Sequence, residues 1–128
     1  MNPITREWVA KAEEDFLSAT DLARRRKTPL WNSVCFHAQQ CAEKYLKARM
    51  QEAGIVIPKT HDLEALLDRL LPIEPLWAAF RPAAQNLTDF AVSFRYPGEN
   101  ATKFEARQSL KDSKAIRREV RLSLGLRV

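Results

Sequence analysis

Apolar residues recur every three or four positions along most of this chain, which is the spacing of one face of an α-helix. Prolines and glycines interrupt the pattern and divide it into segments. The pattern predicts helices over residues 3–26, 30–53, 61–71, 82–92 and 103–124, with one or two further turns over residues 76–80. The second helix is unusual, because residues 28–42 contain no Asp, Glu, Lys or Arg in a chain that is 29% charged. We therefore expect this helix to lie at the centre of the fold, at a subunit contact, or both.

Several helix ends carry typical capping residues. Asn2 and Pro3 suit the cap and the first position of the first helix, and Thr60 suits the cap of the third. Thr102 and Glu105 fit a capping box at the start of the last helix. A glycine follows both the second and the last helix, where we expect it to end each of them.

The segments between the helices predict loops rather than strands. Residues 55–59 are apolar and extended, but no partner strand is nearby, so we expect a loop packed over the helices. Residues 94–99 contain a Pro-Gly pair that favours a tight turn. Only three glycines in 128 residues argue against an all-β fold. The prediction is therefore an all-α protein, with residues 1–128 forming a single domain folded as an up-and-down bundle of four to five helices.

The second helix presents two faces. A broad apolar arc holds Trp31, Val34, Cys35, Ala38, Ala42, Tyr45 and Leu46. A narrower stripe is polar but mostly uncharged and holds Ser33, His37, Gln40, Cys41 and Lys44. The stripe fits a homodimer seam or a core hydrogen-bond network, and it also fits a groove in which His37 and Lys44 hold a phosphate or a base. Both interpretations predict partners for His37 and Gln40, because a buried polar group without one is costly.

The net charge of +5 comes from the C-terminal segment, because residues 102–128 hold eight basic and three acidic side chains. Six of the basic side chains recur every three or four residues and fall within about 80° on a helical wheel. They are Lys103, Arg107, Lys111, Lys114, Arg118 and Arg121. This basic stripe suits either a track for phosphates or a solvated face. Phe104 is the only aromatic residue among them, so base stacking of the single-strand type is not indicated.

Other patterns exclude several classes of site. Cys35 and Cys41 lie six residues apart on one predicted helix and cannot bridge each other, so we expect buried free thiols in a reducing compartment. With only two histidines besides, a zinc site lacks ligands, and neither a metal nor a cofactor is expected. No Ser/His/Asp set or phosphate-binding glycine loop occurs. No apolar run can span a membrane and no secretory signal is visible, so we expect a cytoplasmic location.

Two short segments hold further candidate residues. His61 lies at a helix start, where it either helps capping or faces a cleft. Arg95, Tyr96 and Glu99 share the Pro-Gly turn. Conformationally fixed turns often hold binding residues, but Arg95 and Glu99 also suit a local ion pair.

Residues 31–48 (WNSVCFHAQQCAEKYLKA) resemble the signature second helix of HEPN domains, named as a nucleotide-binding domain of higher eukaryotes and prokaryotes. Residues 59–63 (KTHDL) and 94–99 (FRYPGE) look like two landmarks of the small prokaryotic branch, and an early pattern from Trp8 to Phe16 fits its first helix. The resemblance covers nearly the whole chain. It implies a bundle of four to five helices that forms homodimers. It also implies a neighbouring minimal nucleotidyltransferase, as in a toxin–antitoxin-like pair.

Many HEPN domains are metal-independent ribonucleases that carry an Arg, four to six residues and then a His. This chain lacks that motif, because no Arg stands at this distance before His37 or His61 and no His follows Arg95. We therefore predict a non-catalytic HEPN domain that binds a nucleotidyltransferase partner, a nucleotide or RNA. Arg95, Tyr96 and Lys44 would contact polyphosphate or base, and His37 and His61 would line the groove. Two alternatives are a ribonuclease toxin that brings a histidine to Arg95 in the fold, and a structural dimerisation module without a ligand.

Overall fold

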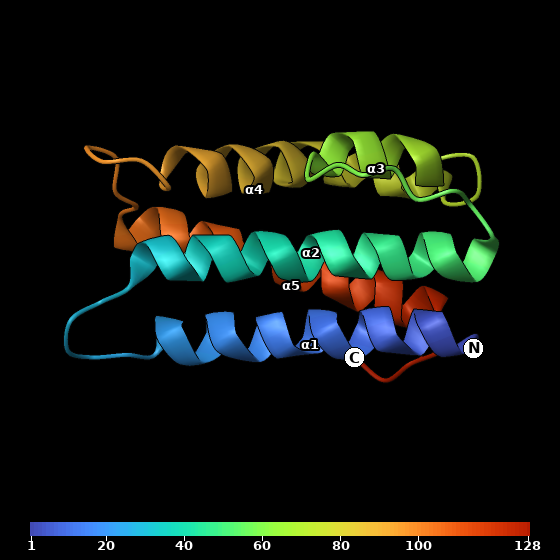
Figure 1. The fold of residues 1–128 in the computed structure, drawn as a ribbon, viewed down its shortest axis with the longest axis horizontal. Coiled ribbons are helices and arrows are strands. Elements are labelled where there is room, and N and C mark those ends of the chain that lie inside the picture. Colours follow the sequence, from blue (N-terminus) through green and yellow to red (C-terminus); the bar gives the residue numbers. More distant parts are fainter.

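The chain folds into five α-helices and one 3₁₀ helix, and the computed structural model describes all residues 1–128. In order they are α1 (Pro3–Ala23), α2 (Trp31–Ala53), α3 (Leu63–Leu70), η1 (Pro75–Phe80), α4 (Arg81–Ser93) and α5 (Lys103–Ser123). Figure 1 shows α2 in the middle, with α1 on one side, α3 and α4 on the other, and α5 behind. α1 and α4 run in one direction and α2 and α5 in the other, so the predicted all-α up-and-down bundle is confirmed.

The other helices pack around α2. No residue from 31 to 51 is exposed, and 12 of the 23 residues in α2 are buried. The largest buried side chains of the main core include Tyr45, Leu46, Met50, Leu63, Leu66, Leu67, Leu70 and Leu87. Within a single chain, neighbouring helices therefore shield the charge-free half of α2, as the sequence predicted.

A smaller apolar cluster closes the end of the bundle where α1 ends, α2 begins and α5 begins. Its buried members are Val34, Cys35, Ala101 and Ala106, and Leu22, Ala23, Trp31, Phe90 and Phe94 pack against them. The Asn32 side chain accepts a hydrogen bond from the Ala101 backbone N–H at 2.7 Å and donates one to Asn100 Oδ1 at 3.1 Å. These bonds attach the segment before α5 to the first turn of α2.

Several predicted helix ends and loops agree with the structure. Asn2 caps α1, and Thr102 and Glu105 form the capping box of α5. Gly54 ends α2 with a positive φ of 70°, a conformation that a side chain would strain. The segment 55–59 is a loop, with Ile55 and Ile57 packed on the core.

Two predicted ends were wrong. α1 ends at Ala23 rather than at residue 26, so the basic run 24–27 lies beyond its last turn. Thr28 has a positive φ of 50° and precedes Pro29, and neither feature fits a continuing helix, so the chain leaves the helix before them. Asp62, not Thr60, caps α3, because its carboxylate accepts a hydrogen bond from the Glu64 backbone N–H at 3.0 Å. A carboxylate suits the positive end of a helix better than a hydroxyl does.

Candidate functional site

The polar stripe of α2 lies against α1, where the carboxylate of Asp15 contacts both His37 and Lys44. His37 Nδ1 is 2.8 Å from Asp15 Oδ1, and Lys44 Nζ is 2.5 Å from Asp15 Oδ2. Gln40 donates a hydrogen bond to Gln39 Oε1 at 2.7 Å, so the predicted partners of His37 and Gln40 are present. The pocket of about 250 Å³ at this place is lined by Lys11, Glu14, Asp15, Ser18, His37 and Lys44. Two carboxylates in that lining disfavour a phosphate, so the geometry supports the core-network interpretation of the stripe.

On the other side of α2, the carboxylate of Glu43 is buried and holds three donors. Glu43 is 4% exposed and accepts hydrogen bonds from Gln39 Nε2 at 3.0 Å and Lys47 Nζ at 3.0 Å. The third partner is His61 Nδ1 at 2.9 Å. Burial alone would raise the pKa of Glu43, but these hydrogen bonds outweigh it and hold the pKa below its ordinary value. The charge of this buried carboxylate is therefore fully partnered.

His61 and Arg95 meet in one pocket, although they lie far apart in the sequence. The pocket of about 260 Å³ is lined by Gln39, His61, Asp62, Thr88, Ala91, Val92 and Arg95. Because Nδ1 of His61 donates to the Glu43 carboxylate, its Nε2 is left free on a ring that is 80% exposed. The arrangement is a carboxylate–histidine pair with an arginine beside it.

Arg95 makes no ion pair with Glu99, so the suggested local pair in the Pro-Gly turn is absent. Its guanidinium lies over the Phe36 ring at 5.3 Å, and that ring meets the His37 ring at 5.2 Å. Arg95 thus shares a pocket with His61, whereas His37 lines a different pocket with Asp15 and Lys44. Tyr96 is 66% exposed in the turn and does not line the pocket of His61.

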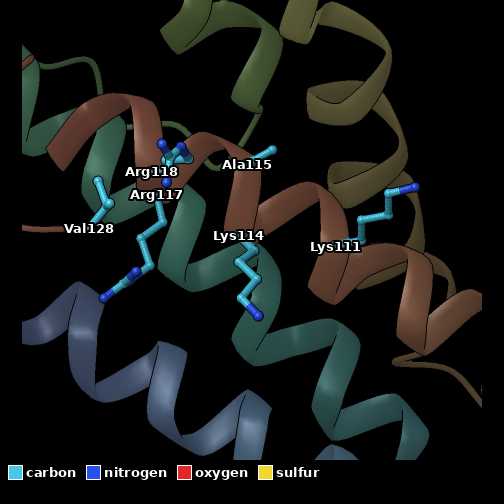
Figure 2. Close-up of a pocket in the computed structure, with 6 residues that line it drawn as sticks. All are labelled: Lys111, Lys114, Ala115, Arg117, Arg118 and Val128. Atoms are coloured by element: carbon cyan, nitrogen blue, oxygen red, sulfur yellow. The ribbon is translucent and has the colours of Figure 1, made fainter. Parts of the chain in front are cut away.

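The cations of α5 divide into two groups, and the first is paired with α1. Arg117 makes two hydrogen bonds to the Glu13 carboxylate, at 3.0 Å and 2.5 Å. Arg121 donates to the Tyr45 hydroxyl at 3.0 Å and lies 3.8 Å from Glu13, and Tyr45 donates to Glu13. Burial alone would raise the pKa of Glu13, but its bonds to Arg117 and Tyr45 hold it below the ordinary value. Figure 2 shows Arg117 extending from α5 toward α1.

The second group is exposed and makes no ion pair or side-chain hydrogen bond. We call it the free basic face, and it consists of Lys103, Arg107, Lys111, Lys114 and Arg118. At a rise of 1.5 Å per residue it extends over roughly 22 Å of α5. Figure 2 shows three of its members around a pocket of about 340 Å³, which is lined by Lys111, Lys114, Ala115, Arg117, Arg118 and Val128. Arg121, a member of the predicted stripe, is half-buried and paired instead.

Both cysteines are buried and free, as expected. Burial raises the pKa of Cys35 and raises that of Cys41 to about 12, which makes both poor nucleophiles at neutral pH. The structure contains no group of three or more His, Cys, Asp or Glu side chains placed to hold a metal ion. None of its helices combines the length and the apolar character needed to cross a membrane.

The sequence matches the family model described as HEPN domain over residues 5–123. This chain belongs to the HEPN domain family. Its fold is similar to the crystal structure of TT1696 from Thermus thermophilus, with a TM-score of 0.74 and 25% sequence identity. The similarity covers 92% of this chain and 96% of that chain. No curated protein matches it.

In this HEPN domain two of the sequence landmarks meet in space. The segments 59–63 and 94–99 supply His61 and Arg95 to the same pocket, which Gln39 from α2 also lines. Sequence reasoning missed the Glu43–His61 pair and the pairing of Arg117 with Glu13. Neither pair has a signal in helical spacing, because the partners are 18 and 104 residues apart.

Proposed function

We propose that this HEPN domain is a non-catalytic subunit that binds RNA or nucleotide phosphates through the free basic face of α5. One observation carries the proposal: five exposed cations follow one side of a helix, and no acidic group of the chain pairs with them. Like charges spaced this way repel one another by a few tenths of a kcal/mol per pair. A bound polyanion would convert that repulsion into attraction and release its own counterions.

Contacts of this kind recognise phosphates rather than base sequence, because an ammonium group acts as a point charge. Binding would therefore depend strongly on salt. For single strands the logarithm of the affinity falls by about 0.7 per phosphate contact for each tenfold rise in salt.

The test is fluorescence anisotropy with a labelled single-stranded RNA at several salt concentrations. Replacement of Lys111, Lys114 and Arg118 by Gln should weaken binding at least tenfold and reduce the salt slope by about 2. The control replaces three exposed, unpaired cations elsewhere, Arg6, Lys59 and Arg69, and changes the net charge equally. Equal losses in both triple variants, or no binding by the wild type at low salt, would contradict the proposal.

A second candidate is metal-independent RNA cleavage in the pocket that His61 and Arg95 share. His61 Nε2 is free to accept a proton, Glu43 orients the ring, and Arg95 could stabilise charge on a phosphate. We expect no cleavage by the wild type in the presence of EDTA if the non-catalytic proposal is right. Cleavage that persists in EDTA and is lost in His61→Asn would favour this candidate instead.

We also propose that the protein forms a homodimer and acts with a minimal nucleotidyltransferase in a toxin–antitoxin-like pair. The family membership supports this, as do the uncharged, half-buried side chains of Phe36 and Gln40, which lie one turn apart on α2. Light scattering should give twice the mass of the chain for the wild type. The Gln40→Glu variant should give a lower mass, because it places like charges at the contact and favours the monomer. A wild-type protein that stays monomeric at high concentration would contradict the dimer. A dimer that binds neither RNA nor nucleotide would leave a purely structural module.

A further inference from the structure

The free basic face begins beside an exposed aromatic ring. Phe104 is 76% exposed, although it is among the largest apolar side chains of the protein. It lies three residues before Arg107 and seven before Lys111, so a helix places all three on one side. Nothing in the chain covers the ring, and the cations around it have no acidic partner.

A pocket that contains a second aromatic residue lies at the same end of the bundle, and Phe104 is not part of its lining. Its volume is about 320 Å³, within the range of small-molecule sites, and it is lined by Pro29, Leu30, Trp31, Asn32, Ser33, Asn100 and Ala101. Ala101 precedes Phe104 by three residues, so the pocket lies at the start of the basic face. The Ser33 hydroxyl and the Asn100 side-chain N–H groups make no hydrogen bond within the chain and are free for a base edge.

More cations stand at the same end of the bundle. Residues 24–27 (RRRK) are all exposed and make no ion pair, and only Thr28 separates them from Pro29, the first residue of this pocket. Leu22 and Ala23 pack on the same apolar cluster as Trp31, which fixes this basic run beside the pocket. Aromatic surface, a small polar-edged pocket and unpaired cations therefore occur at one end of the bundle. The exposed Phe104 ring and the pocket of Trp31 revise the expectation from the sequence, which did not indicate base stacking.

On the basis of the proposed function, we infer that the partner is single-stranded RNA, with one base stacked on Phe104 and another base of the same strand held in the pocket beside Trp31. A duplex buries the faces of its bases in its own stack, so only its two terminal base pairs offer an exposed ring a face to stack on. A single strand offers both its phosphates and its base faces. This combination distinguishes the surface from a simple polyanion site, which would bind duplex and single strand alike.

The experiment compares a labelled RNA of about 12 nucleotides with the duplex of the same length, at one low salt concentration. We expect the wild type to bind the single strand roughly tenfold more tightly, because one stacked base contributes about that factor. Phe104→Leu removes the ring but keeps an apolar side chain, and should abolish most of this preference while duplex binding stays unchanged. Leu76→Ala, at an apolar residue that is 87% exposed in η1, is the control and should change neither affinity.

The pocket has its own variant, Ser33→Leu, which narrows the space and removes a hydroxyl. Its single-strand affinity should fall severalfold while its thermal unfolding stays cooperative, and an unchanged affinity would remove the pocket from the site. Equal affinity of the wild type for duplex and single strand, or wild-type behaviour of Phe104→Leu, would overturn the inference. In those cases the proposed function still stands if RNA binding is lost when Lys111, Lys114 and Arg118 are replaced. No binding to either RNA removes both.

Discussion

Two sets of cations lie on α5, and they differ in burial and in pairing. Arg117 and Arg121, which we call the locked cations, are half-buried and share the Glu13 carboxylate. Lys114 and Arg118, their nearest neighbours, are exposed and unpaired. On a helical wheel Arg121 and Lys114 differ by only about 20°. What separates them is the position of one acidic residue on α1, which spacing within α5 does not reveal.

The comparison shows that a basic stripe is not one functional unit. The locked cations join α5 to α1 and α2 through Glu13 and Tyr45, so they contribute to the fold. The free basic face contributes repulsion to the fold and remains available to a ligand. Substitutions in the two sets should therefore move stability and binding independently.

The largest expected effect is acid unfolding through Glu13, the partner of the locked cations, and Glu43. The pKa values of both carboxyls are lowered in the folded protein, so their stabilisation is complete above the ordinary value of 4.5. It is lost as the pH falls through the lowered values. The free energy of unfolding, measured by urea titration, should stay level from pH 7 to pH 5 and fall steeply below about pH 4.5. The Glu13→Gln/Glu43→Gln double variant should show a weaker fall over the same range, and an identical fall would contradict this account.

The next effect is removal of the shared carboxylate itself. Glu13→Ala leaves Arg117, Arg121 and Tyr45 without their common partner, and should lower the free energy of unfolding by about 2–4 kcal/mol. The adjacent Glu14 is exposed and makes no ion pair, so Glu14→Ala should change stability by less than about 0.5 kcal/mol. RNA affinity of Glu13→Ala, measured well below its melting temperature, should equal that of the wild type. A large loss of affinity would mean that the locked cations also touch the ligand.

A smaller effect, an increase in the free energy of unfolding, is expected from a substitution at Asp112. Its Oδ2 is buried without a partner, and burial raises the pKa of this carboxyl although Gln108 donates a hydrogen bond to it. A raised pKa means that the ionised form costs stability at neutral pH, a cost relieved as the pH falls through that value. Asp112→Asn should therefore raise the free energy of unfolding at pH 7 by up to about 1 kcal/mol. The gain should shrink in acid, and a gain that persists unchanged at pH 4 would have another cause.

The sequence was informative where a property depends on neighbours along the chain. The charge-free run before Glu43, the capping box at Thr102 and the helix stop at Gly54 all appear in the structure as expected. The partners of His61, Arg117 and Arg121 did not follow from the sequence, because each depends on how separate helices pack. Trp31 was correctly placed on the apolar arc of α2, but its position beside the start of α5 needed the tertiary structure.

The smallest expected effect on stability is that of Lys114→Gln. It gives a direct test of the comparison, because the same change to Gln can be made at Arg117, three residues later. Lys114 has Lys111 one turn before it and Arg118 one turn after it, so Lys114→Gln relieves two repulsions and should stabilise the protein by a few tenths of a kcal/mol. The same substitution should weaken RNA binding. Arg117→Gln should instead lower stability, because it removes the ion pair with Glu13, and should leave RNA affinity unchanged. Thermal unfolding and anisotropy on the two variants would measure both quantities, and effects of the same sign in both variants would mean that the two sets of cations form one surface.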